Sequence, residues 1–265
     1  MRAAADTDSR ILQAALALDR ALRERSPIAP LTQAWTDLSV EQAYRISQQF
    51  LGLRLARGER VVGKKIGATS RAVQDMFQVF EPDFGFLLAS MQVADGAAVR
   101  LDRLIQPRAE AELAFMLARD LVGPGVTAAD VLNATESVAP CFEIVDSRIQ
   151  DWRIRIGDTV ADNASCGAFV IGAGREPPRN HDLSSIEARV FKNDVLISRG
   201  LGSAVQGSPL YAVAWLANTL GRLGMPLNAG EWILSGSLVP LEPAAAGDVF
   251  ELQLGPIGTA RVRFE

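Results

Sequence analysis

Two glutamates separated by a single residue are the most distinctive chemical feature of the sequence. Glu110 and Glu112 lie in the segment PRAEAELAFML, which is otherwise largely apolar. In a β-strand, alternate residues share one face, and the two α-carbons would be about 6.6 Å apart. Two carboxylates at that spacing can converge on one cation, whereas on a helix they would diverge. The alternative is a strand whose outer face is solvated, which is the more common location of charged side chains.

A second acidic segment, APCFEIVDSRI, places Glu143 and Asp146 among apolar neighbours. The two residues have opposite parity along a strand, so only one of them can face the side of Glu110 and Glu112. The other is expected to be paired or exposed, and an ion pair between Asp146 and Arg148 is an equally good interpretation. Three carboxylates without a histidine make a hard oxygen site, which suits Mg²⁺ or Mn²⁺ and suits zinc poorly.

Two adjacent lysines, Lys64 and Lys65, are flanked by glycines in VVGKKIGATS, between an apolar strand and a helix start at Thr69 or Ser70. Glycine allows the backbone to approach a ligand closely. A lysine beside a metal-bound anion can hold a substrate carboxylate or move a proton. The alternative is that both lysines are simply solvated.

Three further polar segments are candidates for the same site. EPDFGFLL is predicted to form a turn that contains Asp83. DTVADNASCG contains Ser165 and could present hydroxyl and amide groups to a ligand, although loop formation explains it almost as well. In LSGSL, Ser235 and Ser237 could line a pocket through close backbone approach at Gly236, with Ser237 as a substrate contact, or could mark a bulge.

The composition excludes several classes of protein. The single histidine, His181, lies in the loop-like stretch REPPRNHDL, so neither a Ser-His-Asp triad nor a histidine-rich zinc site is expected. The net charge is −4, with 27 basic and 31 acidic side chains interspersed, which gives no electrostatic footprint for nucleic acid or an anionic membrane. Cys141 and Cys166 lie in apolar segments, and no disulfide is expected.

The sequence has neither an apolar run long enough for a membrane span nor, at its N-terminus, the apolar core of a signal peptide. A cytoplasmic enzyme is therefore expected.

The elements that must position these side chains divide the chain in two. Helices are predicted over 9–25 and from a capping box at Ser39 and Gln42 to Gly58. From about residue 105, short strands alternate with helices that begin near Thr127 and at Ser208. The pattern predicts an α+β protein with a helical region over 1–60 and a mixed β catalytic domain over 61–265, joined as one continuous structural unit. A hairpin turn is predicted at 193–194.

An ordered set of motifs resembles one known family. The set consists of GKKIGATS, EPDFGFLL, LIQPRAEAELAF, FEIVDSRIQDW, DTVADNASCG, AVAWLANTLGRLG and LSGSL. In that order they resemble the 2-keto-4-pentenoate hydratase family of the fumarylacetoacetate hydrolase superfamily, from about residue 35 to the C-terminus. The resemblance implies a mixed β-barrel or roll core with flanking helices, assembled as a homo-oligomer. It also implies Mg²⁺ or Mn²⁺ held by Glu110, Glu112 and Glu143.

The resemblance further implies roles for individual residues. Lys65 and Asp83 match proton-transfer positions, and Ser165 matches a polar contact to the substrate or its attacking water. One departure is Ser208, where relatives usually have a histidine before the proline. We interpret Ser208 as a helix cap, which leaves the metal assignment unchanged but could alter substrate preference.

The implied activity is the addition of water to a 2-hydroxy-2,4-dienoate from aromatic-ring breakdown. An example is the conversion of 2-hydroxypenta-2,4-dienoate to 4-hydroxy-2-oxopentanoate. The nearest alternative is a 4-oxalocrotonate decarboxylase, which expels CO₂ from a similar 2-oxo acid; Asp83 in EPDFG gives the turn its hydratase-like form. A carbon-carbon hydrolase is disfavoured because only His181 could assist its water. A non-catalytic small-acid binding protein is the least favoured alternative.

Overall fold

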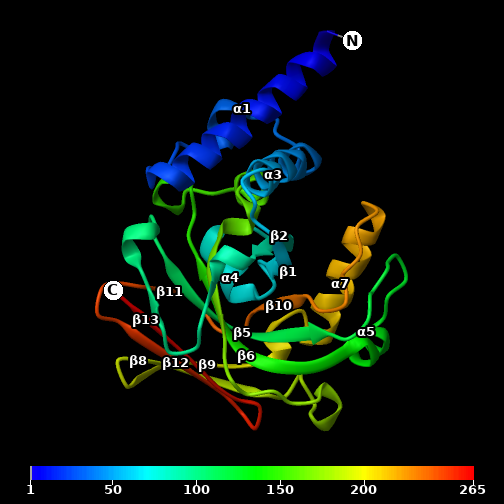
Figure 1. Cartoon of the computed structure of the whole chain (residues 1–265), viewed down its shortest axis with the longest axis vertical. Coiled ribbons are helices and arrows are strands. Elements are labelled where there is room, and N and C mark those ends of the chain that lie inside the picture. The colour runs from blue at the N-terminus through cyan, green and yellow to red at the C-terminus, as the bar shows by residue number, and fades with distance from the viewer. Residues whose placement is uncertain (1) are drawn as a thin grey trace.

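Two β-sheets form the centre of the molecule and helices flank them (Figure 1). The computed structural model describes residues 2–265, with side chains of the first helix from Asp6 onward; Met1, part of the predicted 1–60 region, lies outside the described residues. The larger sheet has eight strands in the order β2-β1-β10-β5-β6-β7-β3, with β11 added beside β5, and it curls into a half-barrel. The smaller sheet has five strands in the order β4-β13-β12-β8-β9. The predicted α+β core with flanking helices is confirmed.

The strands of the larger sheet are β1 (Val61–Gly67), β2 (Asp83–Leu88), β3 (Gln92–Val93), β5 (Arg108–Leu117), β6 (Thr135–Val145), β7 (Cys166–Ile171), β10 (Trp232–Ser237) and β11 (Glu242–Pro243). The strands of the smaller sheet are β4 (Ala98–Val99), β8 (Glu187–Lys192), β9 (Val195–Leu201), β12 (Val249–Leu254) and β13 (Gly258–Phe264). The helices are α1 (Arg2–Glu24), α2 (Leu31–Ala34), α3 (Val40–Leu55), α4 (Arg71–Phe77), α5 (Ala128–Ala134), α6 (Ile156–Ala161) and α7 (Pro209–Arg222).

The N-terminal helices α1 and α3 pack together at one end of the molecule (Figure 1). The predicted capping box is present: Gln42 N–H donates to Ser39 Oγ, and Ser39 N–H donates to Gln42 Oε1. The helix ends at Leu55, three residues before the predicted end at Gly58. The apolar core under these helices also includes Val160 from the later chain, so the helical region packs directly onto the rest of the fold. The division at residue 60 stays a prediction.

Local signals in the second half of the chain also hold. Thr127 caps α5 through a capping box, and the Ser208 hydroxyl accepts the Leu210 N–H at the start of α7. Asn193 and Asp194 connect β8 and β9 with φ angles of 51° and 64°, the left-handed conformation that a tight two-residue hairpin requires. Among the described residues, no helix is both long and apolar enough to cross a membrane.

The segment EPDFGFLL departs from its prediction. A turn was expected there, but β2 begins at Asp83 and pairs antiparallel with β1, and the strand is buried along its length. Gly85, which suggested the turn, is required for a steric reason. A Cβ on Gly85 would lie 2.4 Å from the Asn163 carbonyl oxygen, so glycine is needed here because another segment passes directly against the strand.

Candidate metal centre and its cavity

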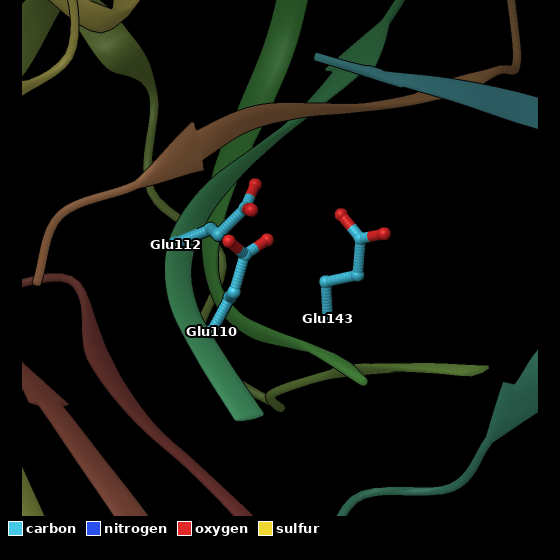
Figure 2. A group of neighbouring side chains, drawn as sticks. All are labelled: Glu110, Glu112 and Glu143. Carbon is cyan, nitrogen blue, oxygen red and sulfur yellow. The ribbon is translucent and has the colours of Figure 1, made fainter. Parts of the chain in front are cut away.

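Three glutamates converge on one point at the centre of the larger sheet (Figure 2). Strands β5 and β6 pair antiparallel with Glu110 directly opposite Glu143, and Glu112 is two residues along the same face of β5. One carboxylate oxygen from each lies within 4.8 Å of those of the other two. All three side chains are buried, and Glu112 and Glu143 have no exposed surface.

The cluster is electrostatically incomplete without a cation. Burial, followed by the neighbouring Glu143 carboxylate, raises the pKa of Glu110 to about 8. Burial likewise raises the pKa of Glu112 and of Glu143. Gly236 N–H donates to Glu112 Oε2, but within the described part of the chain no hydrogen-bond donor reaches Glu112 Oε1 or Glu143 Oε2. Buried carboxylate oxygens without partners are costly, and this all-oxygen set fits a hard divalent cation such as Mg²⁺.

Lys65 is the cation that contacts this cluster. Its Nζ lies 3.0 Å from Glu143 Oε1, and both side chains are almost completely buried. Burial alone would lower the pKa of Lys65, but the carboxylates of Glu143, Glu110 and Asp83 outweigh burial and raise the pKa above its ordinary value. Lys65 therefore supplies one positive charge against three acidic side chains.

Lys64 points to the opposite face of β1, as strand alternation requires. It is also buried, and it forms an ion pair with Glu231. The alternative that both lysines are solvated is therefore wrong. The sequence could not reveal this, because the partners lie about 80 and about 170 residues away along the chain.

Asp83 lies near Lys65 at the start of β2 and is buried. Its Oδ2 accepts the Thr159 hydroxyl at 2.9 Å, and Gly67 N–H also donates to its carboxylate. A Cβ on Gly67 would lie 2.2 Å from Asp83 Oδ1, so only glycine allows this approach. Burial raises the pKa of Asp83, and Lys65 and Thr159 oppose that rise in part. Sequence reasoning did not select Thr159, although it lies inside the polar cluster DTVADNASCG.

Ser165 is placed by an unusual turn. Residues Asn163, Ala164 and Ser165 have φ angles of 54°, 48° and 55°, three consecutive left-handed conformations without a glycine. Such a run costs energy and needs strong local support. The Asn163 side chain provides it: Oδ1 accepts Phe86 N–H at 2.8 Å and Nδ2 donates to Phe86 O at 3.0 Å. The turn brings Ala164 and Ser165 to the wall of a cavity.

One cavity reaches the carboxylate cluster at Glu110 and encloses about 400 Å³ including its open mouth. Its polar lining includes Lys65, Asp83, Glu110, Thr159 and Ser165. The rest of its wall is mainly apolar and contains Val73, Phe77, Val79, Val145, Trp152, Ile154 and Leu241. The site can therefore hold a small molecule that is polar at one end and hydrocarbon at the other.

The Asp146 carboxylate binds the backbone of a neighbouring loop. The ion pair between Asp146 and Arg148 is wrong: the Asp146 carboxylate accepts the N–H groups of Ile105 and Gln106, at 2.9 and 2.7 Å, while Arg148 forms a buried ion pair with Asp162. Asp146 has the opposite parity to Glu143, so its side chain faces the 105–106 loop and stabilises the approach to β5.

Ser237 lies opposite Glu112 in the β10–β5 pair, after a register shift at Gly236, whose φ is 105°. The segment therefore does contain a bulge. The Ser237 hydroxyl donates to Val239 O at 2.8 Å, and Ser237 is not among the described residues that line the cavity. Its contact with a substrate stays a prediction. Cys141 and Cys166 are buried free thiols, as expected.

Comparisons with known proteins agree with this geometry. The family model for the fumarylacetoacetate hydrolase C-terminal domain matches residues 55–265. The 2-hydroxyhexa-2,4-dienoate hydratase of Comamonas testosteroni is 60% identical over 249 residues, 93% of this chain and 94% of that protein. The 2-hydroxypent-2,4-dienoate hydratase of Pseudomonas putida is 57% identical over 78% of this chain and 94% of its own length.

A solved structure extends the similarity to the fold. The 4-oxalocrotonate decarboxylase from Pseudomonas putida G7, complexed with magnesium and adipate, superposes with a TM-score of 0.93. It is 32% identical, and the match covers 97% of this chain and 98% of that one.

Proposed function

Because the chain belongs to the 2-keto-4-pentenoate hydratase branch of the fumarylacetoacetate hydrolase family, we propose that it adds water to a short 2-hydroxy-2,4-dienoate. Such compounds form when aromatic rings are broken down, and 2-hydroxypenta-2,4-dienoate would give 4-hydroxy-2-oxopentanoate. The observation that carries the proposal is the buried carboxylate cluster, which opens through Glu110 into a cavity that also contains Lys65 and Asp83. The 60% identical relative, named for the same chemistry, supports it.

Glu110, Glu112 and Glu143 would hold the divalent cation, with Mg²⁺ or Mn²⁺ as the metals that suit an all-carboxylate site. When bound, the cation would supply Lewis-acid stabilisation to the carboxylate and the 2-oxygen of the substrate. The unpartnered oxygens of Glu112 and Glu143 support this assignment. Magnesium is present in the similar decarboxylase structure.

The chain's own groups account for the proton movements. Ketonisation of the pentadienoate moves a proton from the 2-oxygen to C5 and leaves a double bond between C3 and C4. Addition of water then places a hydroxyl on C4 and a proton on C3. Asp83, held by Thr159, is positioned to accept or deliver one of these protons. Lys65 presents a buried ammonium to the anionic end of the substrate or exchanges a proton with it, and Ser165 contacts the substrate or the attacking water.

The second candidate function is decarboxylation of 4-oxalocrotonate, favoured by the structural match to a decarboxylase. That enzyme is 32% identical, whereas the hydratase relatives reach 57% and 60%, so hydration is the better supported reaction. The homo-oligomer implied by the family resemblance is part of this proposal, and light scattering during gel filtration tests it.

Product analysis separates the two reactions. Purified protein is incubated with a dienoate monoacid and with 4-oxalocrotonate, with Mg²⁺ or with EDTA, while dienoate absorbance and CO₂ release are followed. We expect loss of the monoacid without CO₂ release, only when metal is present. Asp83→Asn should lower hydration by about two to four orders of magnitude. Asp75→Asn, which changes an exposed carboxylate on α4, should not. Efficient CO₂ release from 4-oxalocrotonate with no hydration of the monoacid would establish the decarboxylase instead.

A further inference from the structure

Two aromatic side chains form part of the apolar wall of the cavity. Phe77 is the last residue of α4, and Trp152 ends the 3-10 turn Gln150–Trp152. Their rings stack with centroids 5.2 Å apart and an interplanar angle of 26°. Both side chains line the cavity that contains Lys65 and Glu110. The stack therefore belongs to the surface that a substrate tail meets.

The position of Trp152 is imposed by the fold. Asp151 and Trp152 have φ angles of 58° and 54°, and a bulky residue in the left-handed region is strained. The indole Nε1–H donates to Gln106 O at 3.0 Å and fixes the ring. The Gln106 side chain in turn donates to the backbone oxygens of Ser147 and Ile149. Because these contacts hold Trp152 in a strained backbone conformation, the indole ring has a fixed position in the cavity wall.

Arg108 contacts the same stack. Its guanidinium carbon is 5.7 Å from the Phe77 ring centroid and 5.2 Å from that of Trp152. Arg108 shares a face of β5 with Glu110, about 6.6 Å further along the strand. The Glu242 carboxylate on the neighbouring strand β11 acts on the guanidinium and opposes the lowering of its pKa by burial, but forms no ion pair with it. The guanidinium makes a weak contact from Nη1 to Met76 Sδ at 3.7 Å. It touches the rings but does not line the cavity.

We propose that the Phe77–Trp152 stack is the specificity-determining wall of the site and that it separates the cavity from Arg108. A substrate with a hydrocarbon tail fits against this wall, whereas a second carboxylate would lose its hydration there without gaining a partner. Arg108, the cation that contacts this stack, could receive such a carboxylate but is screened from the cavity by the two rings. This inference rests on the proposed dienoate hydratase activity and narrows it to monocarboxylic dienoates.

If the wall acts by screening Arg108, its effect on substrate preference should depend on the charge of Arg108. If the rings screen the guanidinium, removing Phe77 opens a path from the cavity to Arg108. The variant should then accept a dicarboxylate, and the gain should disappear when Arg108 is also removed. A wall that acted by volume alone would enlarge the substrate range without any dependence on Arg108.

The test compares two substrates of equal length, 2-hydroxyhexa-2,4-dienoate and 2-hydroxyhexa-2,4-dienedioate, which differ in a methyl or a carboxylate at the end. The ratio of kcat/KM values is measured with Mg²⁺. We expect the wild type to prefer the monoacid at least 100-fold, because an unpaired carboxylate is expensive to bury. Phe77→Ala should reduce this preference at least tenfold, and Phe77→Ala combined with Arg108→Leu should restore it. Phe80→Ala, which changes an exposed phenylalanine just after α4, is the matched control.

A binding measurement keeps this inference separate from the activity. Calorimetric titration with 2-oxohexanoate and 2-oxohexanedioate in the presence of Mg²⁺ should show the same order of preference without turnover. If the wild type hydrates neither dienoate, the proposed function fails, while the binding ratio still tests the wall. The inference is overturned if the wild type binds both oxo acids equally, or if Phe77→Ala leaves the ratio unchanged. A gain in dicarboxylate binding that survives the loss of Arg108 overturns the screening role.

Discussion

Replacing Glu112 by glutamine is expected to stabilise the metal-free protein and to remove its response to Mg²⁺. The ligand oxygens of the three glutamates lie within 4.8 Å of one another, where two full charges repel by about 3.5 kcal/mol at an effective dielectric of 20. Partial protonation lowers that repulsion, because burial and the neighbouring carboxylates raise the pKa of Glu112. Glutamine keeps the shape and can still accept the Gly236 N–H. We expect the metal-free variant to gain about 1–2 kcal/mol.

Metal reverses the order of stability. A cation present at 100 times its Kd stabilises the folded state by about 2.7 kcal/mol. For a chain of this size, 1 kcal/mol shifts the melting temperature by about 2–4 °C, so the wild type should gain about 5–10 °C. If glutamine weakens binding about 100-fold, the same Mg²⁺ concentration stabilises the variant by only about 0.4 kcal/mol, or about 1 °C.

The assay is thermal unfolding of both proteins in EDTA and in Mg²⁺, together with dienoate turnover. The melting temperatures should cross: the variant is higher in EDTA, and the wild type is higher in Mg²⁺. Glu136→Gln makes the same chemical change at an exposed position of β6 and should follow the wild type. A wild type that melts at one temperature in EDTA and Mg²⁺, and that keeps full activity in EDTA, would refute the metal assignment.

Two other perturbations probe the residues around the cluster. Lys65→Met should lower activity far more than Lys64→Met does. Lys64→Met should instead lower the melting temperature, because it leaves the buried Glu231 without its cation. Equal, mild losses of activity in both variants would show that Lys65 has a structural role only. Thr159→Val removes a hydrogen bond that lowers the pKa of Asp83, so the pH below which kcat/KM falls should move upward. Thr159→Ser should keep the wild-type profile, and an unchanged profile in both variants would exclude an ionised Asp83 from the reaction.

Short-range signals in the sequence predicted much of this fold correctly. The capping box at Ser39, the cap at Ser208 and the hairpin at 193–194 each depend on two to four neighbouring residues, and each is present. The alternation of Glu110 and Glu112 placed both on one strand face, and parity allowed Glu143 to join them. The sequence could not supply the register of β5 against β6, which sets Glu110 directly opposite Glu143.

The errors have a common physical origin in contacts between distant segments. An ion pair between Arg148 and the nearby Asp146 was one of two open interpretations, but Arg148 is completely buried and bonds Asp162 on another element. Gly85 suggested a turn, although its lack of a side chain serves the passage of Asn163 against β2. In both cases the local pattern had two meanings, and only the packing of the whole chain selects one of them.

Several strained and electrostatically unfavourable features of this chain lie around one cavity. The cluster at Glu110 contains three carboxyl groups, and the single charge of Lys65 cannot neutralise all of them. The turns at 151–152 and 163–165 place residues other than glycine in left-handed conformations. Members of all three features line the same space. A sequence selected only for stability would not collect such costs in one place. Their coincidence argues that the fold holds the lining of this cavity in position at a cost in stability.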